Sequence, residues 1–465
     1  MKLERGKIPA PSRKRKPTKR SRRPQLESDG AEIRDPIHGY IFANSLEREV
    51  IDTSVLQRLR RIRQLAGCHL IYPGGQHSRF EHVIGCMFLA GRVGGVLESR
   101  GFGFEKESTL KLRISALLHD VGHGPFSHMF EEVLAGKTDV THEDMSERII
   151  RGTEVGDILG SHGFSKSEIS KLAVGKSTSE KTFMNEVIGG GLSVDIMDYL
   201  LRDSYFTGVE YGKVDVHRII NSFQVVGQEL AISQAAVFAF EALMISRYQM
   251  FRAVYFHRTV RAAELMLIKS MILADKALNL TDLSLPNYLS LTDEITLQRI
   301  MNLDPAGDKE LKLAKKLAID YQRRRLLKCV FEQTVQMRDG FLSSIFNQRS
   351  FREGLEAQIA DRAGVDIADV WVDVPTAPSV PVSSARESFR EVTIVRAGHE
   401  NESNRTRKNV PQSYTLGIRE LPLVGTLSGY MDIMRVYSTL ENRARVKKAA
   451  ESVLLREGYE SKVSM

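Results

Sequence analysis

LLHDVGHGPFSH, residues Leu117–His128, is the stretch of sequence that decides the fold. A leucine-rich helix is expected to run into His119 and Asp120 and to end there, because two glycines and a proline follow at once. An imidazole next to a carboxylate can bind one cation from two sides. Two ligands hold a divalent metal poorly, so the remaining ligands must come from elsewhere in the chain.

Two other predicted helices carry polar side chains that suit such a site. His82 lies in SRFEHVIGC, on a helix whose other face is apolar. The helix in LSVDIMDYLLRD has four polar residues on one face by their i, i+4, i+7 and i+8 spacing, and these are Asp195, Tyr199, Arg202 and Asp203. A carboxylate, a phenol and a guanidinium on one face of an otherwise apolar helix indicate a polar pocket that holds a phosphate.

Each of these histidines also has a purely structural interpretation. A lone histidine on an amphipathic helix is more often a hydrogen-bonded core residue than a ligand, and an HD dipeptide alone is weak evidence. However, His119, His123 and His128 fall within ten residues, separated by glycines that let the backbone approach a ligand closely. A structural cluster of neutral imidazoles would need partners for both nitrogens of each ring. The density of histidines therefore favours a site.

Apolar residues recur at helical spacing through most of the chain, from Ile33 to about residue 350. Stretches rich in Val and Pro at Val370–Val382 and Phe389–Val395 indicate extended structure, and a helical pattern returns from Gly429 to Leu455. The predicted fold is therefore mostly α, with a helical core and a small α+β C-terminal appendage.

These patterns divide the chain into three parts. Residues 1–30 are expected to form a disordered basic arm and linker, residues 31–350 the helical core, and residues 351–465 the C-terminal α+β region. Within the last part, Ala397–Gln412 is polar and is expected to be mobile.

The net charge of +8 is concentrated at one end of the chain. Eleven Lys and Arg residues lie between Met1 and Arg23 against one Glu, while the rest of the chain carries 55 basic and 57 acidic residues. Such an arm can condense on nucleic-acid phosphates, or it can have no specific partner. The sequence leaves both interpretations open.

No stretch of the chain reaches the ~18 uninterrupted apolar residues that a membrane span needs. The most apolar one, Leu230–Ile245, is interrupted by polar residues, and the basic arm lacks the apolar region of a secretory signal. Cys68, Cys86 and Cys329 show no CxxC spacing, which suits core thiols in a reducing compartment. We therefore expect a soluble, cytoplasmic protein without a membrane partner.

The order of His82, the adjoining pair His119 and Asp120, and then Asp195 resembles the metal-binding signature of the HD superfamily. Longer strings narrow the resemblance, over residues 33–265, to its deoxynucleoside triphosphate triphosphohydrolases, which include a vertebrate enzyme with SAM and HD domains. These strings are DPIHG (Asp35–Gly39), QRLRRIRQL (Gln57–Leu65), YPGGQHSRFEH (Tyr72–His82), HDVGHGPFSHMFE (His119–Glu131) and DYLLRD (Asp198–Asp203). No SAM domain is expected here, because the arm is too short to fold as one.

The resemblance implies a helical HD-domain core that holds one divalent transition-metal ion. Its ligands would be His82, His119, Asp120 and Asp195. Imidazole and carboxylate ligands suit Mn, Fe, Zn, Ni and Co alike, so the identity of the metal stays open. Mg²⁺ could accompany the bound nucleotide.

The resemblance also implies roles for the residues around the substrate. His123, His128 and His142 would line the path of the phosphates, with His128 as general acid to the leaving oxygen and Glu131 orienting a histidine. The implied substrate-binding residues are Arg79 and Arg247 at the phosphates, Gln64 and Asp203 at the sugar hydroxyl, and Tyr199 and Tyr255 as a wall that rejects a 2′-hydroxyl.

The implied reaction is water attack on the α-phosphorus of a deoxynucleoside triphosphate, which releases the deoxynucleoside and intact inorganic triphosphate. Well-known members of the family are activated by nucleotide, GTP or dGTP, bound at subunit interfaces. Asp52, Gln57 and Arg60 stand at the matching positions, and we expect a homo-oligomer, either a dimer or a tetramer. The alternative interpretation of these three residues is a solvated helix face.

Three positions depart from the pattern of the family. Ile196 stands where the vertebrate enzyme has a Lys after the last metal-binding Asp, and Phe256 replaces a Gln beside Tyr255. Ala31 replaces a basic residue upstream of DPIHG. The metal ligands are unaffected, but base preference, phosphate length and activation stay open.

Two other classes of function remain. The same metal ligands serve any phosphoester, so another HD phosphohydrolase, such as a nucleoside monophosphatase or a phosphodiesterase, is the second hypothesis. The third is a nucleic-acid-binding protein that uses the basic arm, with the HD core as a scaffold.

Overall fold

The structure of the protein is a computed structural model that describes residues 30–135, 137–179, 181–337, 349–374, 376–378, 391–396, 412–421, 423–424 and 430–454. The expected basic arm of residues 1–30 lies outside these residues apart from Gly30, and so does the expected mobile segment up to residue 411. Both expectations therefore stay predictions.

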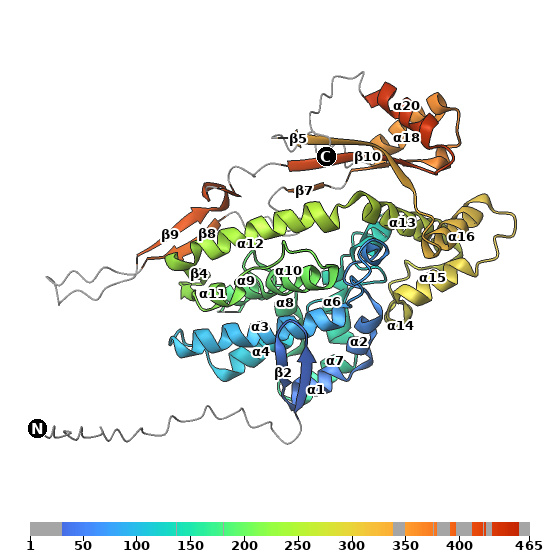
Figure 1. Ribbon diagram of the computed structural model, residues 1–465. Helices are drawn as coiled ribbons and strands as arrows, with labels where there is room; N and C mark the ends of the chain where they lie inside the picture. Colours follow the sequence, from blue (N-terminus) through green and yellow to red (C-terminus); the bar gives the residue numbers. More distant parts are fainter. Residues whose placement is uncertain are drawn as a thin grey trace, which may run out of the picture.

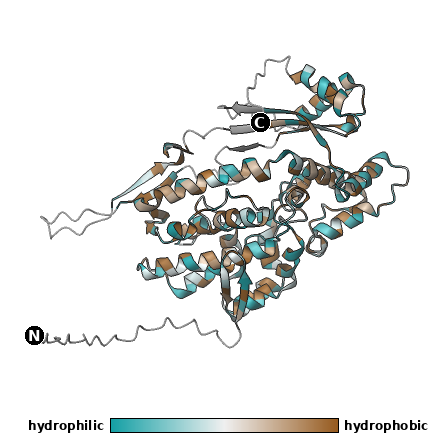
Figure 2. Cartoon of the chain, in the orientation of Figure 1, coloured by the Kyte–Doolittle hydropathy of each residue, from teal (hydrophilic) through white to brown (hydrophobic). Residues whose placement is uncertain are grey.

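Most of the described chain is helical, which confirms the predicted fold class (Figure 1). Hydrophobic and hydrophilic residues alternate along the same helices, as expected of amphipathic helices that each bury one face (Figure 2). The helices of the core are α1 (Ser45–Ile51), α2 (Ser54–Arg58), α3 (Arg79–Ser99), α4 (Lys106–Leu118), α5 (His128–Leu134), α6 (His142–Gly152), α7 (Glu154–Ser161), α8 (Lys166–Ala173), α9 (Phe183–Gly189), α10 (Val194–Thr207), α11 (Val216–Ile220), α12 (Val237–Met250), α13 (Arg258–Leu278), α14 (Leu285–Ser290), α15 (Asp293–Met301) and α16 (Lys309–Gln322).

Helix α3 is the central element of this core. Its start is fixed by the Glu81 carboxylate, which accepts a hydrogen bond from the Ser78 backbone N–H at 2.8 Å. The helix packs against α4 and α10, and residues such as Val83 and Met87 are fully buried. By length and composition α3 could cross a membrane, but 67% of its most apolar window is buried inside the protein, as in a core helix.

Small sheets lie at the edges of the helical core. An antiparallel hairpin is formed by β1 (Ala31–Asp35) and β2 (Gly39–Ala43). A second sheet has the order β3 (Phe223–Val226), β4 (Glu229–Ser233), β8 (Glu391–Val395) and β9 (Ser413–Gly417). A third has the order β5 (Lys328–Met337), β10 (Tyr430–Ser438) and β6 (Val370–Asp373), with β7 (Thr376–Pro378) also paired to β10.

The helical pattern predicted up to residue 350, and again from Gly429, is wrong at several strands. These are β5 and β10, together with the hairpins β1–β2 and β3–β4. Short apolar runs do not distinguish a strand from a helix by periodicity, and β5 finds its partner β10 about a hundred residues further along the chain. The extended structure expected near residues 370 and 391 is confirmed by β6 and β8.

The C-terminal appendage has a hydrophobic core of its own. Helices α18 (Arg349–Ala363) and α20 (Arg443–Leu454) pack against the sheet of β5, β10 and β6. The fully buried residues of this core include Ile359, Val436 and Val446. The predicted α+β character of the region is therefore confirmed, but its sheet recruits β5 from before residue 350, and β8 and β9 join the hairpin β3–β4 instead (Figure 1).

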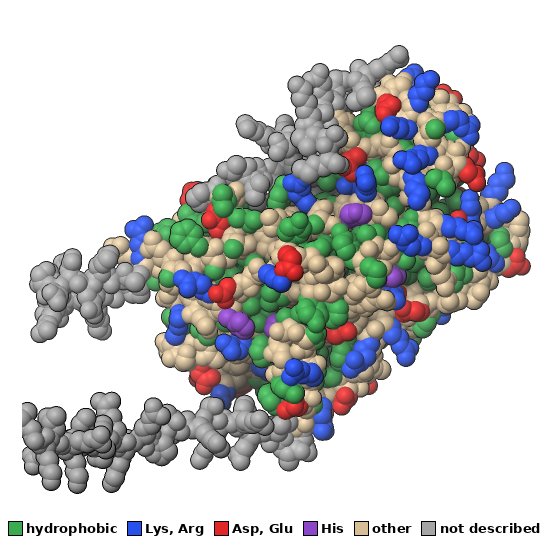
Figure 3. Space-filling view, viewed as in Figure 1, with side chains coloured by type: hydrophobic (Ala, Val, Ile, Leu, Met, Phe, Trp, Pro, Cys, Tyr) green, Lys and Arg blue, Asp and Glu red, His purple; other side chains and the backbone are tan. Residues whose placement is uncertain are grey.

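The surface outside the arm carries charges of both signs. Acidic and basic side chains are interspersed over the face in Figure 3, and Lys and Arg side chains gather where α15 and α16 lie. This distribution agrees with the nearly balanced charge expected of the body of the chain.

Candidate metal centre and active site

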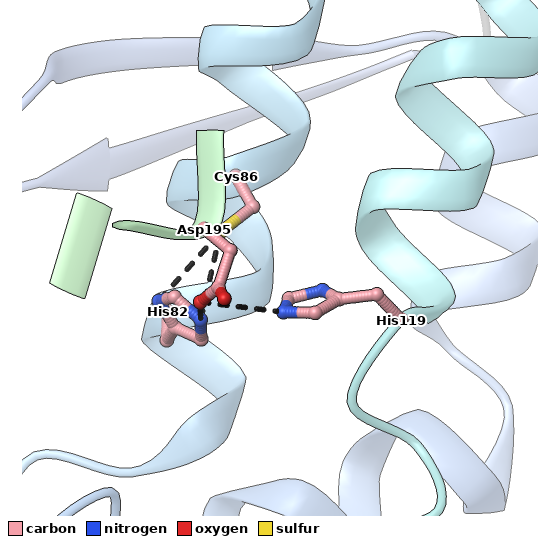
Figure 4. Close-up of side chains that lie close together, drawn as sticks. All are labelled: His82, Cys86, His119 and Asp195. Carbon is pink, nitrogen blue, oxygen red and sulfur yellow. Dashed lines mark hydrogen bonds and ion pairs between the residues drawn. The ribbon is translucent and has the colours of Figure 1, made fainter. Parts of the chain in front are cut away.

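The structure brings together the four residues expected to bind metal. His82 lies in the first turns of α3, His119 and Asp120 follow the end of α4, and Asp195 lies in the first turn of α10. His82 Nε2 lies 3.1 Å from Asp195 Oδ1 and 3.7 Å from Asp120 Oδ2. His119 Nε2 lies 3.2 Å from Asp120 Oδ1 and 3.8 Å from Asp195 Oδ1. The two imidazoles thus converge on the same carboxylates, and Figure 4 shows both directed at Asp195.

In both rings the hydrogen bond made by Nδ1 determines that Nε2 is the nitrogen available to a metal. His119 Nδ1 donates to the Ala116 carbonyl oxygen at 2.8 Å, and His82 Nδ1 donates to Asp198 Oδ2 at 2.8 Å. Nε2 of both rings therefore faces Asp120 and Asp195, and His82 Nε2 shares a proton with Asp195 Oδ1 at 3.1 Å. His119 Nε2 is buried and makes no hydrogen bond of acceptable geometry. Two imidazole nitrogens that face two carboxylates need a positive charge between them, so these residues fit one divalent transition-metal ion.

The pKa shifts of the same groups indicate that the space between these side chains favours a positive charge. Burial opposes the charged form of the His82 imidazole, but Cys86 and the hydrogen bonds to Asp195 and Asp198 outweigh it and raise the pKa of His82 well above its usual value. Burial likewise opposes the charge of Asp195, yet His119 and His82 hold its pKa well below the usual range. A cluster that attracts a proton so strongly would also attract a metal cation.

A carboxylate that the sequence did not point out supports the cluster from behind. Asp198 is fully buried and accepts hydrogen bonds from His82 Nδ1 at 2.8 Å, His38 Nε2 at 2.7 Å and Arg202 Nε at 2.8 Å. Arg202 also donates to Asp35 Oδ2 at 2.9 Å. Its guanidinium is thus occupied by two carboxylates, and the phosphate-pocket role suggested for Arg202 by its helix face is wrong. The spacing of Asp198 and Arg202, i and i+4, was the available signal for this pair.

Cys86 lies one helical turn after His82 and is also close to the cluster. Its Sγ is 3.6 Å from both ring nitrogens of His82 (Figure 4). Burial raises the pKa of Cys86 to about 12, so it stays a thiol. The expectation of a buried core thiol is met at Cys86 and Cys68, whereas Cys329 is partly exposed.

The second group of predicted residues lies beside the first. His142 Nδ1 pairs with Glu131 Oε1, and His128 Nδ1 lies 3.6 Å from Glu131 Oε2. The rings of His123 and His142 are stacked with their centroids 4.0 Å apart. His123 Nε2 lies 3.4 Å from Asp120 Oδ1, so this histidine connects the two groups.

Close backbone packing is needed for this arrangement. A Cβ atom on Gly122 would lie 2.0 Å from the carbonyl oxygen of His142, so only glycine lets the start of α6 approach the end of α4. Phe126 and Ser127, just before α5, both have a φ of +59°. Such left-handed backbone at non-glycine residues is strained and occurs preferentially at functional sites.

Two arginines bring positive charge to the same region. Arg79 Nη1 donates to Asp120 Oδ2 at 2.5 Å, and Arg79 Nε donates to Ser127 Oγ at 2.7 Å. Arg247 is buried, and its Nε has no hydrogen-bond partner. Its charge acts on the neighbouring phenol of Tyr199, whose pKa burial raises to about 12. Arg247 thus has a donor free for an anionic ligand.

The residues expected around the sugar also lie together. Asp203 accepts hydrogen bonds from Tyr255 Oη at 2.7 Å and from His77 Nε2 at 2.8 Å. The rings of Tyr199 and Tyr255 meet edge to face at 6.4 Å. The backbone N–H of Gln64 donates to the carbonyl oxygen of His77, and Gln64 Oε1 is buried without a partner. His77, which the sequence did not point out, thus joins this group.

The three residues expected to bind an activator lie just after α1 (Asp52), in α2 (Gln57) and in the 3-10 turn that follows α2 (Arg60). Asp52 is exposed at the end of α1, and Gln57 Nε2 donates to the Ile51 carbonyl oxygen at 2.9 Å. Arg60 donates to Gln57 Oε1 at 2.8 Å and lies 3.5 Å from the ring centroid of Phe80. Gln57 and Arg60 are therefore hydrogen-bonded to each other, whereas no side-chain hydrogen bond or ion pair links Asp52 to either.

Comparison with known proteins shows which protein family this chain resembles. Residues 79–203 match the family model of the HD domain, and residues 214–395 match that of the HD associated region. An uncharacterized protein from Methanocaldococcus jannaschii is 37% identical over 280 residues, which cover 58% of this chain and 57% of that protein. A deoxynucleoside triphosphate triphosphohydrolase SAMHD1 homolog from Dictyostelium discoideum is 31% identical over 318 residues, which cover 64% of this chain and 60% of that protein.

A solved structure shares the fold. The crystal structure of a phosphohydrolase from Bacteroides thetaiotaomicron superposes with a TM-score of 0.67 at 22% identity, covering 88% of this chain and 100% of that one. The chain spans less than two thirds of the length of the first two relatives above. Because a His and Asp cluster converges from α3, the end of α4 and the start of α10, and because both regions match in order, the chain belongs to the family of HD-domain proteins.

Proposed function

We propose that the protein hydrolyses deoxynucleoside triphosphates to deoxynucleoside and inorganic triphosphate. The observation that carries the proposal is the convergence of the Nε2 atoms of His82 and His119 on Asp120 and Asp195. Buried arginines and a histidine cluster next to it supply the donors that a polyphosphate needs. The relative from Dictyostelium discoideum bears the name of this activity.

In this proposal His82, His119, Asp120 and Asp195 hold one divalent transition-metal ion. When bound, such an ion polarises a phosphate oxygen and makes water more acidic. Arg79 and Arg247 bind and orient the phosphates, which places the α-phosphorus for attack by water. These residues select for a phosphoester but not for a particular base.

The leaving group needs a proton. The attacking water forms a bond to the α-phosphorus, and the bond from the α-phosphorus to the 5′ oxygen breaks. His128 is the donor in this proposal, because its ring is the most exposed of the cluster and it lies 3.6 Å from Glu131, which orients it. His123 and His142 line the phosphate path between His128 and Asp120.

The sugar would lie among the residues that surround Asp203. Tyr255 and His77 hold the Asp203 carboxylate in place, so it can accept a hydrogen bond from the 3′-hydroxyl. Tyr199 stands between this carboxylate and the metal ligands, and with Tyr255 it would reject a 2′-hydroxyl by bulk. Gln64 Oε1, buried without a partner, supplies a further acceptor.

The residue after Asp195 supports a second candidate function. This candidate is another HD phosphohydrolase that acts on a substrate with fewer phosphates. Ile196, which follows Asp195, is buried and apolar, so it makes none of the contacts that a Lys would make with a polyphosphate. A nucleoside monophosphatase or a phosphodiesterase needs fewer such contacts. Activation by GTP or dGTP through Asp52, Gln57 and Arg60, in a dimer or tetramer, is a further proposal at the subunit surface.

Product analysis tests the proposal. The metal-loaded protein is incubated with each deoxynucleoside triphosphate, with and without GTP or dGTP, and with each deoxynucleoside monophosphate. The products are separated by ion-exchange chromatography, with Asp195→Ala as the control. We expect inorganic triphosphate from the triphosphates. Orthophosphate from the monophosphates alone would establish the second candidate instead.

A further inference from the structure

A second set of metal-binding groups lies outside the four proposed ligands. His123, His128, Glu131 and His142 each offer one ligand atom, and these atoms all lie within 4.8 Å of one another. His128 and Glu131 come from the first turn of α5, and His142 begins α6. The proposed reaction uses them only to bind phosphates and to move a proton.

The chemistry of this set is that of a transition-metal site. Three imidazoles and one carboxylate are common ligands of Zn²⁺ and Co²⁺, which take such nitrogen and oxygen donors in tetrahedral geometry. A hydrogen-bonded relay would leave no buried nitrogen without a partner. His123 is 1% exposed, and its Nδ1 has no hydrogen-bond partner.

The position of His123 directs that free nitrogen toward the cluster. Its Nε2 lies 3.4 Å from Asp120 Oδ1, the arrangement in which Nε2 carries the proton and Asp120 accepts it. The lone pair is then on Nδ1, which lies 4.0 Å from Glu131 Oε1. Glu131 is also the partner of His142, so the side chains of His123 and His142 are directed at the same carboxylate.

The site is open to solvent on one side. The His128 side chain is 61% exposed and the Glu131 side chain 31%, whereas His123 closes the inner end. A metal ion can therefore enter past His128 without unfolding the core. This entry path and the set of ligands are the features that a metal site requires.

We propose that His123, His128, Glu131 and His142 bind a second divalent transition-metal ion when such ions are abundant. The ion takes the place of the proton that Glu131 and His142 share, and that proton is released to solvent. Binding at this site does not depend on the proposed function. The effect of the second ion on catalysis rests on the proposed function. With its imidazole bound to metal, His128 cannot protonate the leaving oxygen, so excess transition metal inhibits hydrolysis.

Metal stoichiometry tests the binding. The full chain, stripped of metal, is dialysed against Co²⁺ alone, and Co²⁺ bound per chain is measured by mass spectrometry. We expect two equivalents for the natural sequence and the loss of one equivalent in Glu131→Gln and in His142→Gln. Asp195→Ala should also lose one, from the other site.

A matched control uses a histidine paired with a glutamate elsewhere. His162 lies 3.2 Å from Glu49 on the surface, so His162→Gln removes the same chemistry and should keep two equivalents. One equivalent in the natural sequence overturns the proposal, and so do two equivalents in both Glu131→Gln and His142→Gln. Because both variants replace groups at the solvent side, at least one is expected to fold, which circular dichroism checks.

The same Co²⁺ titration, followed by triphosphate release, separates this proposal from the proposed function. Release should rise as the first equivalent binds and fall as the second binds. Two bound equivalents with undiminished release would refute the inhibition. Two bound equivalents of Co²⁺, with no release when Mn, Fe, Zn, Ni or Co is supplied with GTP or dGTP, would refute the proposed function while the second site stands.

Discussion

At the scale of single residues, the fully buried Asp198 determines how the metal ligand His82 is held. It accepts hydrogen bonds from His82, His38 and Arg202. Burial opposes its charge, but Arg202 and both histidines keep the pKa of Asp198 well below its usual range. It is therefore an anion whose charge is needed by all three partners.

Asp198→Asn keeps the shape of the side chain but removes this charge. We expect the variant to be less stable by roughly 3–5 kcal/mol, because a buried guanidinium loses one of its carboxylates. Metal affinity should fall about tenfold to a hundredfold, because His82 loses the anion that orients it. Urea unfolding and Co²⁺ dialysis measure the two effects, and Asp139→Asn, at an exposed position, is the control. Equal stability of the two variants would contradict this role.

Single residues also show how much of the candidate site could be predicted from the sequence. Polar ligand types on otherwise apolar helices marked His82 and Asp195 as candidates beside His119 and Asp120, and the resemblance to the HD superfamily implied that these four residues bind one metal. The supporting residues His38 and His77 were missed. Each pairs with a carboxylate more than a hundred residues away, and such a pair is visible only when the helices are packed.

At the scale of elements, the contact of α3 with α10 depends on a missing side chain. A Cβ atom on Gly85 would lie 1.9 Å from Asp198 Oδ1 and 2.5 Å from Arg202 Nη2. Gly85→Ala should therefore destabilise the protein by roughly 1–3 kcal/mol through overpacking. Gly95→Ala, on the same helix with open space around it, should be more stable by up to about 1 kcal/mol. Urea unfolding compares them, and a Gly85→Ala variant as stable as Gly95→Ala would argue against this contact.

The contact of α9 with β4 makes stability depend on pH. Burial, with the nearby charge of Glu229, raises the pKa of Glu186 to about 7, although a hydrogen bond from the Leu230 N–H opposes the shift. The folded state thus favours protonated Glu186, and this stabilisation is complete below a pH near the unfolded pKa of about 4.5 and is lost as the pH rises through 7.

Glu186→Gln removes the titration. Relative to the natural sequence, the free energy of unfolding of the variant should rise between pH 4.5 and 8 by on the order of 1–3 kcal/mol. The measurement is urea unfolding across this range. A difference between the two proteins that does not change with pH would exclude this effect.

The elements themselves were predicted unevenly. Long helices with a continuous apolar stripe, such as α3 and α10, were recognisable from their period. Strands β5 and β10 were not, because each is stabilised by pairing with the other rather than by a local pattern. Topology of this kind is a property of the folded chain.

At the scale of the whole molecule, a buried ion pair joins the C-terminal region to the core. Arg261 of α13 donates to both oxygens of Asp373 in β6, at 3.1 and 2.9 Å. We propose that α18, α20 and the sheet of β5, β10 and β6 form a unit that docks on the helical core through this pair and through Trp371 and Tyr437, which pack into the hydrophobic core of the helices.

Asp373→Asn should weaken the docking, because a buried arginine loses an anionic partner and keeps Glu264 at 2.8 Å and Glu132 at 3.9 Å. We expect faster hydrogen exchange of the amides in β6 and β10, with unchanged exchange in α3. Lys276→Ala, which removes the exposed pair with Asp308, is the control and should change neither region. Uniformly faster exchange would indicate that the two parts unfold as one.

The account as a whole rests on one cation held by residues from three helices and used to hydrolyse a nucleotide. The most direct measurement is triphosphate release from deoxynucleoside triphosphates by His119→Ala, compared with the natural sequence at equal protein and metal concentrations. We predict a soluble, folded variant by circular dichroism that releases no detectable triphosphate. A folded His119→Ala protein that releases triphosphate at the natural rate would contradict the account.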